Sequence, residues 1–360
     1  MSPTAGKVSG PVGAGPLCIL AASVLWGTTG TAATFAPQVG PLAVGAAAMG
    51  VGGLLQGLVA APRIRREAHR LRAQRGRVLL GALAVGLYPL AFYSSMHLAG
   101  VAAGSVVSIG SAPIASAVIE RLVEGRRFTR RWTTGAVLGV SGTVLLTLAQ
   151  AARTHPGEGS RSAGDAVLGL SLALVAGVSY ALYSWTARRL LKGGTTPPAT
   201  MGALFGLGGV LLLPLLVIVG DPLVESWPNA AVGTYMALVP MFLGYTLFGR
   251  GLAHVPASTA TTLSLLEPAV AAVLAVLVVG ERLSPPGWGG ITLLLGALAV
   301  FTAPPRRSTD AHTVAVPDPV TPDRLPPPAQ APREPANLGH TKTDHLPVDG
   351  FPRRGREAGT

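Results

Sequence analysis

The sequence contains little charge, few aromatic residues and a single cysteine. Charged residues make up 12% of the 360 positions, about half the share of an average soluble domain, which argues against a soluble fold. The cysteine, Cys18, lies in an apolar run, so we expect no disulfide framework and no metal cluster. No segment resembles a Walker A loop, and direct use of ATP is therefore not expected. We predict neither a cofactor nor a metal site.

Hydrophobic residues, at 49%, fall instead in blocks of about 20 separated by short polar links. A hydrocarbon core ~30 Å thick needs about 20 helical residues to cross it, and only helices satisfy their backbone there without closing into a barrel. The pattern predicts an all-α membrane protein with ten transmembrane helices. The predicted spans are residues 17–35, 41–61, 78–97, 101–122, 132–151, 164–187, 198–219, 230–250, 256–279 and 285–303.

The net charge of +12 comes from the links between these blocks. Eighteen Lys and Arg residues lie on one side of the predicted bundle and three on the other, with seven arginines in residues 63–77 alone. Such a bias places the basic links in the cytoplasm. We therefore predict cytoplasmic N- and C-termini in a bacterial cytoplasmic (inner) membrane. Lipid is the expected partner of the basic links, and nucleic acid is not.

The two halves resemble each other at an offset of 154–155 residues. The run LAGVAAGSVVSIGSAP, which ends at Pro113, matches LAHVPASTATTLSLLEP, which ends at Pro268, and Trp26 pairs with Tyr180. Because each copy holds five spans, an odd number, the second copy inserts upside-down, as the inverted repeats of secondary transporters do. The predicted organisation is a short N-terminus (1–15), two five-helix repeats (16–152 and 164–303) and a disordered Pro-rich tail (304–360).

Several motifs resemble the EamA-type branch of the drug/metabolite transporter superfamily over about residues 15–303. They are VLWGTTGTA in the first span, GVAAGSVVSIGSAPIASAVIERLVEGRR in spans four to five, and LSLLEPAVAAVLAVLVVGERL in the ninth span and the turn after it. The resemblance implies a ten-helix inner-membrane carrier, often an exporter of amino acids, other metabolites or drugs. The chain departs from the pattern of this family at two places that bear on the identity of the substrate. Met49 stands where relatives tend to have arginine, and the first-half turn reads Glu124-Gly125-Arg126 instead of Gly-Glu-Arg.

Glu267 is the only carboxylate near the middle of a predicted span. A charge there costs about 2.5–3.5 kcal/mol on insertion scales, so it needs a partner, water or a proton. Pro268 beside it frees a backbone carbonyl one turn earlier. We hypothesise that Glu267 lines a central cavity and binds substrate or a coupling proton. The alternative is a structural carboxylate that holds free N–H groups of a neighbouring helix.

Prolines and aromatic residues mark the remaining candidates for a substrate pathway. We expect five prolines to interrupt spans: Pro89, Pro113, Pro214, Pro240 and Pro268. Paired helix breaks in two repeats mark the expected substrate region, because unwound backbone supplies polar groups at mid-membrane depth. Trp26, Tyr88 and Tyr180 are candidates to line an aromatic cavity suited to amphipathic or cationic substrates. His97 is a candidate for gating or titration. Interface anchoring is expected of Trp185, Tyr235 and Phe248, which lie near span ends.

The sequence predicts a secondary transporter that moves a small metabolite or drug by alternating access, and not an enzyme. One alternative is an integral-membrane group-transfer enzyme, but Glu67, Glu120 and Glu124 are scattered and no His cluster accompanies them. Another is a sensor or assembly protein that acts through the Pro-rich tail. A homodimer stays open, although the GxxxG spacings at Gly53 and Gly135 are interpreted as ordinary helix packing.

Overall fold

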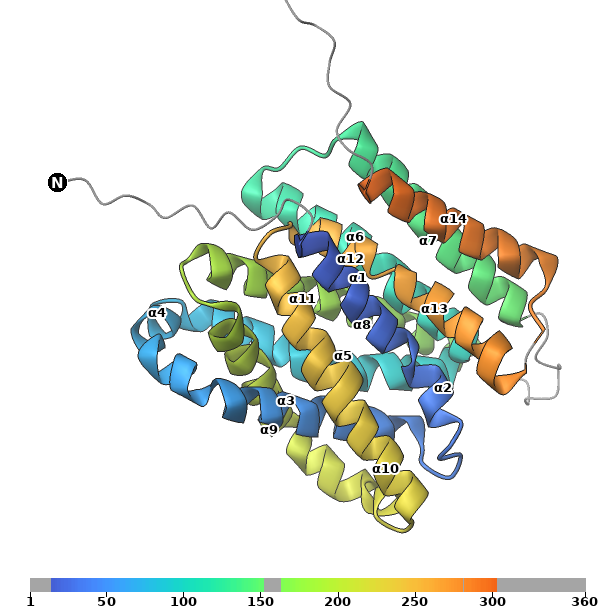
Figure 1. Ribbon diagram of the computed structural model, residues 1–360, viewed down its shortest axis with the longest axis horizontal. Coiled ribbons are helices and arrows are strands. Elements are labelled where there is room, and N and C mark those ends of the chain that lie inside the picture. Colours follow the sequence, from blue (N-terminus) through green and yellow to red (C-terminus); the bar gives the residue numbers. More distant parts are fainter. Residues whose placement is uncertain (1–13, 152–162, 281, 303–360) are drawn as a thin grey trace, which may run out of the picture. The chain divides into compact units, whose positions relative to one another are not determined.

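The computed structural model describes residues 14–151, 163–280 and 282–302, and in these ranges it is helical without any strand (Figure 1). The predicted disordered tail, the N-terminal 13 residues and the link at 152–162 lie outside the described residues.

The first group of helices corresponds to the first five predicted spans. Its elements are α1 (Ala14–Gly27), α2 (Thr29–Ala33), α3 (Pro41–Arg66), α4 (Ala68–Ala73), α5 (Arg75–Ala99), α6 (Val101–Glu124) and α7 (Arg130–Ala151).

The second group contains more interruptions. Its elements are α8 (Ala163–Lys192), α9 (Pro197–Val219), the 3₁₀ turn η1 (Asp221–Leu223), α10 (Trp227–Met236), the π-helical η2 (Ala237–Leu243), α11 (Gly244–Leu252), α12 (Ala257–Leu263), α13 (Leu266–Leu274), the π-helical η3 (Ala275–Val279) and α14 (Pro285–Thr302).

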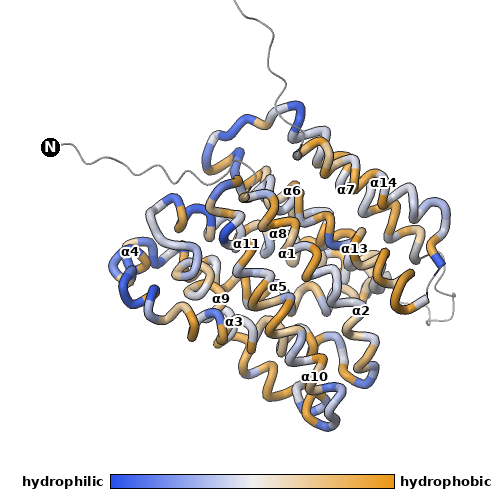
Figure 2. The backbone as a smooth tube through the Cα atoms, in the orientation of Figure 1, coloured by the Kyte–Doolittle hydropathy of each residue, from blue (hydrophilic) through white to orange (hydrophobic). Residues whose placement is uncertain are grey.

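Length and composition make these helices suitable for a bilayer. Nine helical stretches in the described residues are long and apolar enough to cross a membrane, and a tenth, Pro285–Phe301, is apolar but shorter. Large apolar side chains such as Leu58, Val217 and Ile218 point outward, with 73–78% of their surface exposed. Figure 2 shows hydrophobic residues along the helices and hydrophilic ones gathered at links such as α4. The prediction of an all-α membrane protein is confirmed.

Close pairs of helices are built on glycine. An added Cβ at Gly53 of α3 would meet the carbonyl oxygen of Phe205 in α9, and one at Gly57 would lie 3.0 Å from the Cα of Gly206. Likewise α7 and α14 run side by side (Figure 1), and a Cβ at Gly142 would lie 2.8 Å from the Gly290 oxygen. These small residues therefore serve packing within the chain, as interpreted from the sequence.

The expectation that prolines interrupt the spans is right for Pro240 and Pro268 and wrong for the other three prolines. Pro89, Pro113 and Pro214 lie inside continuous helices. In a membrane the flanking backbone groups have no water as an alternative partner, so the helix continues around the lost bond. By contrast, Pro240 lies in the π-helical η2, and Pro268 follows the break at residues 264–265 between α12 and α13.

Candidate functional site

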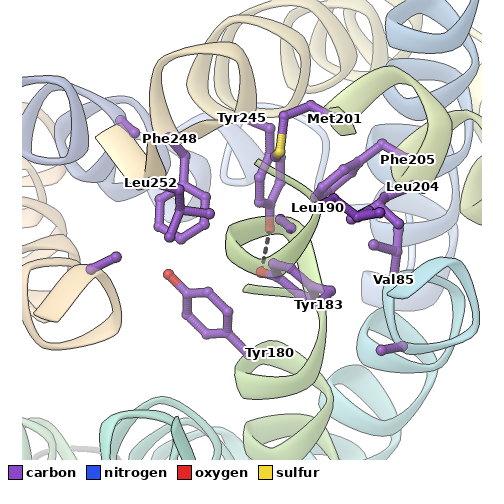
Figure 3. Close-up of a cluster of buried hydrophobic side chains, with 14 of the residues drawn as sticks. Val85, Tyr180, Tyr183, Leu190, Met201, Leu204, Phe205, Tyr245, Phe248 and Leu252 are labelled. Atoms are coloured by element: carbon purple, nitrogen blue, oxygen red, sulfur yellow. Dashed lines mark hydrogen bonds between the residues drawn. The ribbon is translucent and has the colours of Figure 1, made fainter. Parts of the chain in front are cut away.

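A cluster of six aromatic side chains lies where α1, α5, α8 and α11 meet, and Figure 3 shows four of them. Trp26 of α1 packs against Tyr245 and Phe248 of α11, with ring centroids 4.8 and 5.3 Å away. It also meets Tyr180 of α8 edge-on at 6.4 Å, and Tyr180 lies 5.9 Å from Tyr88 of α5. We call these six rings the aromatic cluster: Trp26, Tyr88, Tyr180, Tyr183, Tyr245 and Phe248. Phe205 of α9 packs at its edge, with its ring centroid 4.2 Å from that of Tyr245.

The structure thus brings together three residues that the sequence singled out, Trp26, Tyr88 and Tyr180. The other three members of the cluster carry no sequence signal beyond being aromatic in neighbouring turns. Phe248 was expected at the membrane interface, and this prediction is wrong because Phe248 is fully buried against Trp26. The prediction rested on the position of Phe248 near the end of a predicted span, but the helix continues to Leu252.

Hydrogen bonds tie the polar edges of the cluster to broken segments of helix. The Trp26 indole N–H donates to the carbonyl oxygen of Pro240 at 2.9 Å, within π-helical η2. The hydroxyl groups of Tyr183 and Tyr245 lie 3.0 Å apart (Figure 3). Buried Tyr and Trp usually have such partners, because an unpaired polar group in an apolar interior is costly. The cluster is therefore apolar in bulk but polar at defined points.

The second helix break lies beside Tyr180. The Tyr180 hydroxyl donates to the Ser264 hydroxyl at 2.8 Å, and Ser264 in turn donates to the Thr261 carbonyl oxygen at 2.9 Å. Ser264 and Leu265 separate α12 from α13, so this relay joins the aromatic cluster to the break.

Glu267 lies in the first turn of α13, directly after that break. Its backbone adjoins α1, since a Cβ at Gly27 would lie 3.0 Å from the Glu267 carbonyl oxygen. The carboxylate is within electrostatic range of the hydroxyl groups of Tyr88, Tyr180 and Tyr245. Among the described residues it has no hydrogen-bond or ion-pair partner. The alternative role, holding N–H groups of a neighbouring helix, therefore has no contact to support it here.

The other predicted site residues lie outside the cluster. Pro113 is buried within α6 and forms no break. His97 is exposed in the last turn of α5. Trp185 donates from its indole N–H to Glu124 at 3.0 Å, and Tyr235 lies 2.7 Å from the Thr28 hydroxyl.

Sequence reasoning missed two buried carboxylates that bind helix N-termini. Glu120 of α6 accepts from the Ser258 backbone N–H at 3.1 Å and from its hydroxyl at 2.7 Å, in the first turn of α12. Glu67 accepts in the same way from the N–H and hydroxyl of Thr196, at 2.8 and 2.7 Å, at the start of α9. We call these contacts the carboxylate clasps. A helix N-terminus favours a negative charge, which explains the arrangement.

Both clasps lie at one end of the bundle, which we call the basic end because the Arg-rich links meet there. Further polar bonds join helices at this end. Arg188 donates to the carbonyl oxygens of Leu252 and Ala253, and Arg131 to those of Val300 and Phe301.

At the opposite end the described contacts between helices are mainly apolar. A cluster of buried apolar side chains forms there around Ala47, Val232 and Met236. The described polar bonds at this end include that between Thr28 and Tyr235 and that from the Asn229 side chain of α10 to the Pro222 carbonyl oxygen of η1. The two ends of the bundle are therefore held by different kinds of contact.

No group of three or more His, Cys, Asp or Glu side chains in the described ranges is placed to hold a metal ion. The chemistry available at the aromatic cluster is therefore binding by rings, hydroxyl groups and one carboxylate.

Comparison with known proteins decides the family. Residues 13–148 and 167–303 match the model of the EamA-like transporter family. The chain belongs to this family. Membership confirms that it is a membrane transporter, and that the integral-membrane enzyme considered from the sequence is not supported.

Several curated relatives are transporters. The chain is 35% identical over 298 residues to the uncharacterized transporter YwfM of Bacillus subtilis, covering 82% of this chain and 96% of the relative. It is 27% identical over 287 residues to a probable terminal-alkyne amino-acid exporter of Streptantibioticus cattleyicolor, covering 77% and 90%.

Two further similarities are more limited. Identity to the threonine/homoserine exporter RhtA of Escherichia coli is 30% over 117 residues, 32% of this chain and 39% of RhtA. A solved crystal structure superposes with a TM-score of 0.64 at 21% identity, over 80% of this chain and 96% of the other, which shows a shared fold.

Proposed function

We propose that this protein is a secondary transporter that exports small amphipathic molecules bearing an amino group, such as amino acids or their analogues, by alternating access. The observation that carries the proposal is the placement of Glu267 directly after the helix break at which Ser264 binds the Tyr180 hydroxyl of the aromatic cluster.

The packing of the helices supports two inverted five-helix repeats. In the proposed repeat, α1 corresponds to α8, α5 to α11, and α6 to α12 and α13. Helix α8 packs against α5 and α6, and α1 packs against α11 and α13. Exchanging the two halves therefore maps one set of neighbours onto the other. Ten spans in two inverted copies suit a carrier, because swapping the conformations of the copies moves the opening from one side to the other.

The aromatic cluster lies on the contact between the halves, which is where such carriers bind their substrate. Trp26 belongs to the first half and Tyr180 to the second, and they occupy matching positions in the repeat. Because the rings pack against one another, the structure corresponds to a state closed around its centre. A substrate has to separate the rings, and π faces attract a cationic amino group once they part.

The carboxylate clasps support a particular direction of closure. Each clasp joins corresponding helices of the two halves: Glu67 and Thr196 connect the end of α3 with the start of α9, and Glu120 and Ser258 connect α6 with α12. Hydrogen bonds to charged groups are worth about 1.5–3 kcal/mol each, whereas apolar contacts have no preferred geometry to lose. We infer that the basic end is closed in this structure, and the excess of Lys and Arg supports a cytoplasmic position for that end. The termini then lie in the cytoplasm, in the inner membrane of a bacterium.

Two kinds of observation support the proposed substrate class: the side chains of the site and the names of two relatives. Glu267 supplies a negative charge for an amino group, and the rings of Trp26 and Tyr88 supply apolar contact. Two of the relatives are named as exporters of amino acids. Export of amino-acid-like compounds fits both.

Efflux measurements in cells test the proposal. Cells expressing the chain are screened for tolerance to amino acids, their analogues and cationic drugs, and efflux of the positive compounds is then compared in the wild type and Glu267→Gln. Loss of one charged hydrogen bond, about 1.5–3 kcal/mol, predicts a roughly ten- to hundredfold slower efflux in the variant. Glu225→Gln is the matched control, because Glu225 is an exposed carboxylate in the link before α10.

Two outcomes would contradict the proposal in different ways. Full efflux by Glu267→Gln with an unchanged pH dependence removes Glu267 from the mechanism. A screen in which no compound is exported faster by cells that carry the chain removes the exporter itself.

A further inference from the structure

An apolar groove runs along the outside of the bundle between α6 and α7. It has a volume of about 560 Å³, and its walls are side chains such as Ile114, Val118, Ala136 and Val137. Ile114, Val118 and Val137 are 49–59% exposed, so the groove opens outward to the surroundings of the helices. Nothing described in the chain fills it.

A basic pocket adjoins the groove at the basic end. Its volume is about 150 Å³, and it is formed by the link between α6 and α7 together with Thr259 and Phe301. Phe128 and Trp132 line both spaces, with ring centroids 4.4 Å apart, so the groove continues into the pocket. The indole N–H of Trp132 is buried there without a hydrogen-bond partner.

Charge at this junction is positive and largely uncompensated. Arg121 lines the groove and Arg127 lines the pocket, and neither has an ion-pair partner in the described part of the chain. The nearby carboxylates are occupied, since Glu120 binds Ser258 and Arg126, and Glu124 binds Lys192 and Trp185.

We propose that this groove and pocket form a binding site for one anionic phospholipid. An acyl chain lies in the apolar groove between α6 and α7, and the phosphate lies against Arg121 and Arg127. Basic pockets between membrane helices on the cytoplasmic side bind anionic head groups in this way. Trp132 and Phe128, which line both spaces, are aromatic residues of the kind that is favoured at the membrane interface.

Occupancy of this site has a structural consequence. The lipid would contact α6, which carries Glu120, and α7, which packs on α14. It would thereby support the helix whose clasp closes the basic end.

Quenching of Trp132 by brominated lipid tests the proposal. The full chain is purified in detergent and mixed with unbrominated phosphatidylcholine. Brominated phosphatidylglycerol or brominated phosphatidylcholine then replaces an increasing mole fraction of that lipid, and tryptophan fluorescence is measured. The contribution of Trp132 is the difference between the wild type and Trp132→Phe. We expect half-maximal quenching at a mole fraction of phosphatidylglycerol at least about fivefold lower than that of phosphatidylcholine. Each of R121Q and R127Q lowers this preference by about fivefold, as roughly expected for one basic residue near an anionic surface.

The matched control is R72Q, which removes an exposed arginine of α4 at the same end of the bundle. Its preference should stay within about twofold of the wild type. Equal quenching by the two lipids, or an equal loss in R72Q, would overturn the proposal in favour of ordinary lipid contact. Displacement of the lipid by millimolar inorganic phosphate would show a site for the free anion instead. Cross-linking of Val137→Cys into a dimer that shields Trp132 from both lipids would show that a second copy covers the groove.

Discussion

The clasp between α6 and α12 gives a quantitative prediction. Glu120→Gln keeps the size of the side chain but removes its charge. Two bonds join Glu120 to Ser258, one to each carboxylate oxygen. Gln keeps one oxygen, a neutral acceptor worth about 1 kcal/mol less than a charged one, and its amide nitrogen can only donate, so the second bond loses at least as much. The ion pair with Arg126 adds little, because that side chain is 38% exposed and screened. The variant should therefore favour opening of the basic end by about 2 kcal/mol, or roughly ten- to thirtyfold.

A cysteine placed behind the clasp reports the opening. Ser116 lies one turn before Glu120, is fully buried and contacts Thr261 of α12. In a Cys18→Ser background, the rate at which a membrane-impermeant maleimide labels Ser116→Cys from the basic side should rise roughly ten- to thirtyfold when Glu120→Gln is added.

Glu124→Gln is the matched control, because Glu124 lies one turn further along α6 but binds Trp185 and Lys192 of α8. Labelling of Ser116→Cys should change little in that variant. No acceleration in Glu120→Gln, or the same acceleration in both variants, would refute the idea that the clasp closes this end.

Two further predictions concern stability and coupling at the site. Tyr180→Phe removes the hydroxyl that donates to Ser264, so thermal unfolding in detergent should show a loss of about 1 kcal/mol and efflux should slow. Ser264→Ala removes the same bond, and the double variant should lose little more than either single one; additive losses would contradict the pairing. Gly206→Ala should lower the free energy of unfolding by about 1–3 kcal/mol, since its Cβ would lie 2.9 Å from the Gly57 Cα. Gly296→Ala, where no atom lies within 4 Å, should be neutral or slightly stabilising, and equal effects would rule out this packing.

The helices were the part of the fold that the sequence predicted well. Apolar length alone decides which segments cross a bilayer, and each of the ten predicted segments is helical, with ends displaced by a few residues. Whether the last segment spans fully stays a prediction, because Pro285–Phe301 is short.

Hydropathy did not predict where helices break. Pro89 and Pro113 sit in continuous helices, whereas the matching region of the second half contains η2 and the break before Glu267. The difference depends on neighbours from distant segments. Trp26 donates to the Pro240 carbonyl across 214 positions, which no local pattern contains.

The candidate site was only partly predicted from the sequence, because some of its contacts also join distant segments. A carboxylate inside an apolar span and the aromatic residues Trp26, Tyr88 and Tyr180 stand out in a sequence with few of either. Glu67 and Glu120 did not, because they lie at span ends among arginines and resemble ordinary link residues. Their role depends on the N-termini of α9 and α12, more than 120 residues away.

Reciprocal accessibility of the two ends is the most direct test of a single pathway that opens to alternate sides. Ala47→Cys reports the apolar end, where Ala47 is 5% exposed, and Ser116→Cys reports the basic end. When Glu120→Gln is introduced, we expect labelling at position 116 to rise and labelling at position 47 to fall in step. If both positions become more accessible together, or if position 47 does not respond, the two halves do not exchange conformations as proposed.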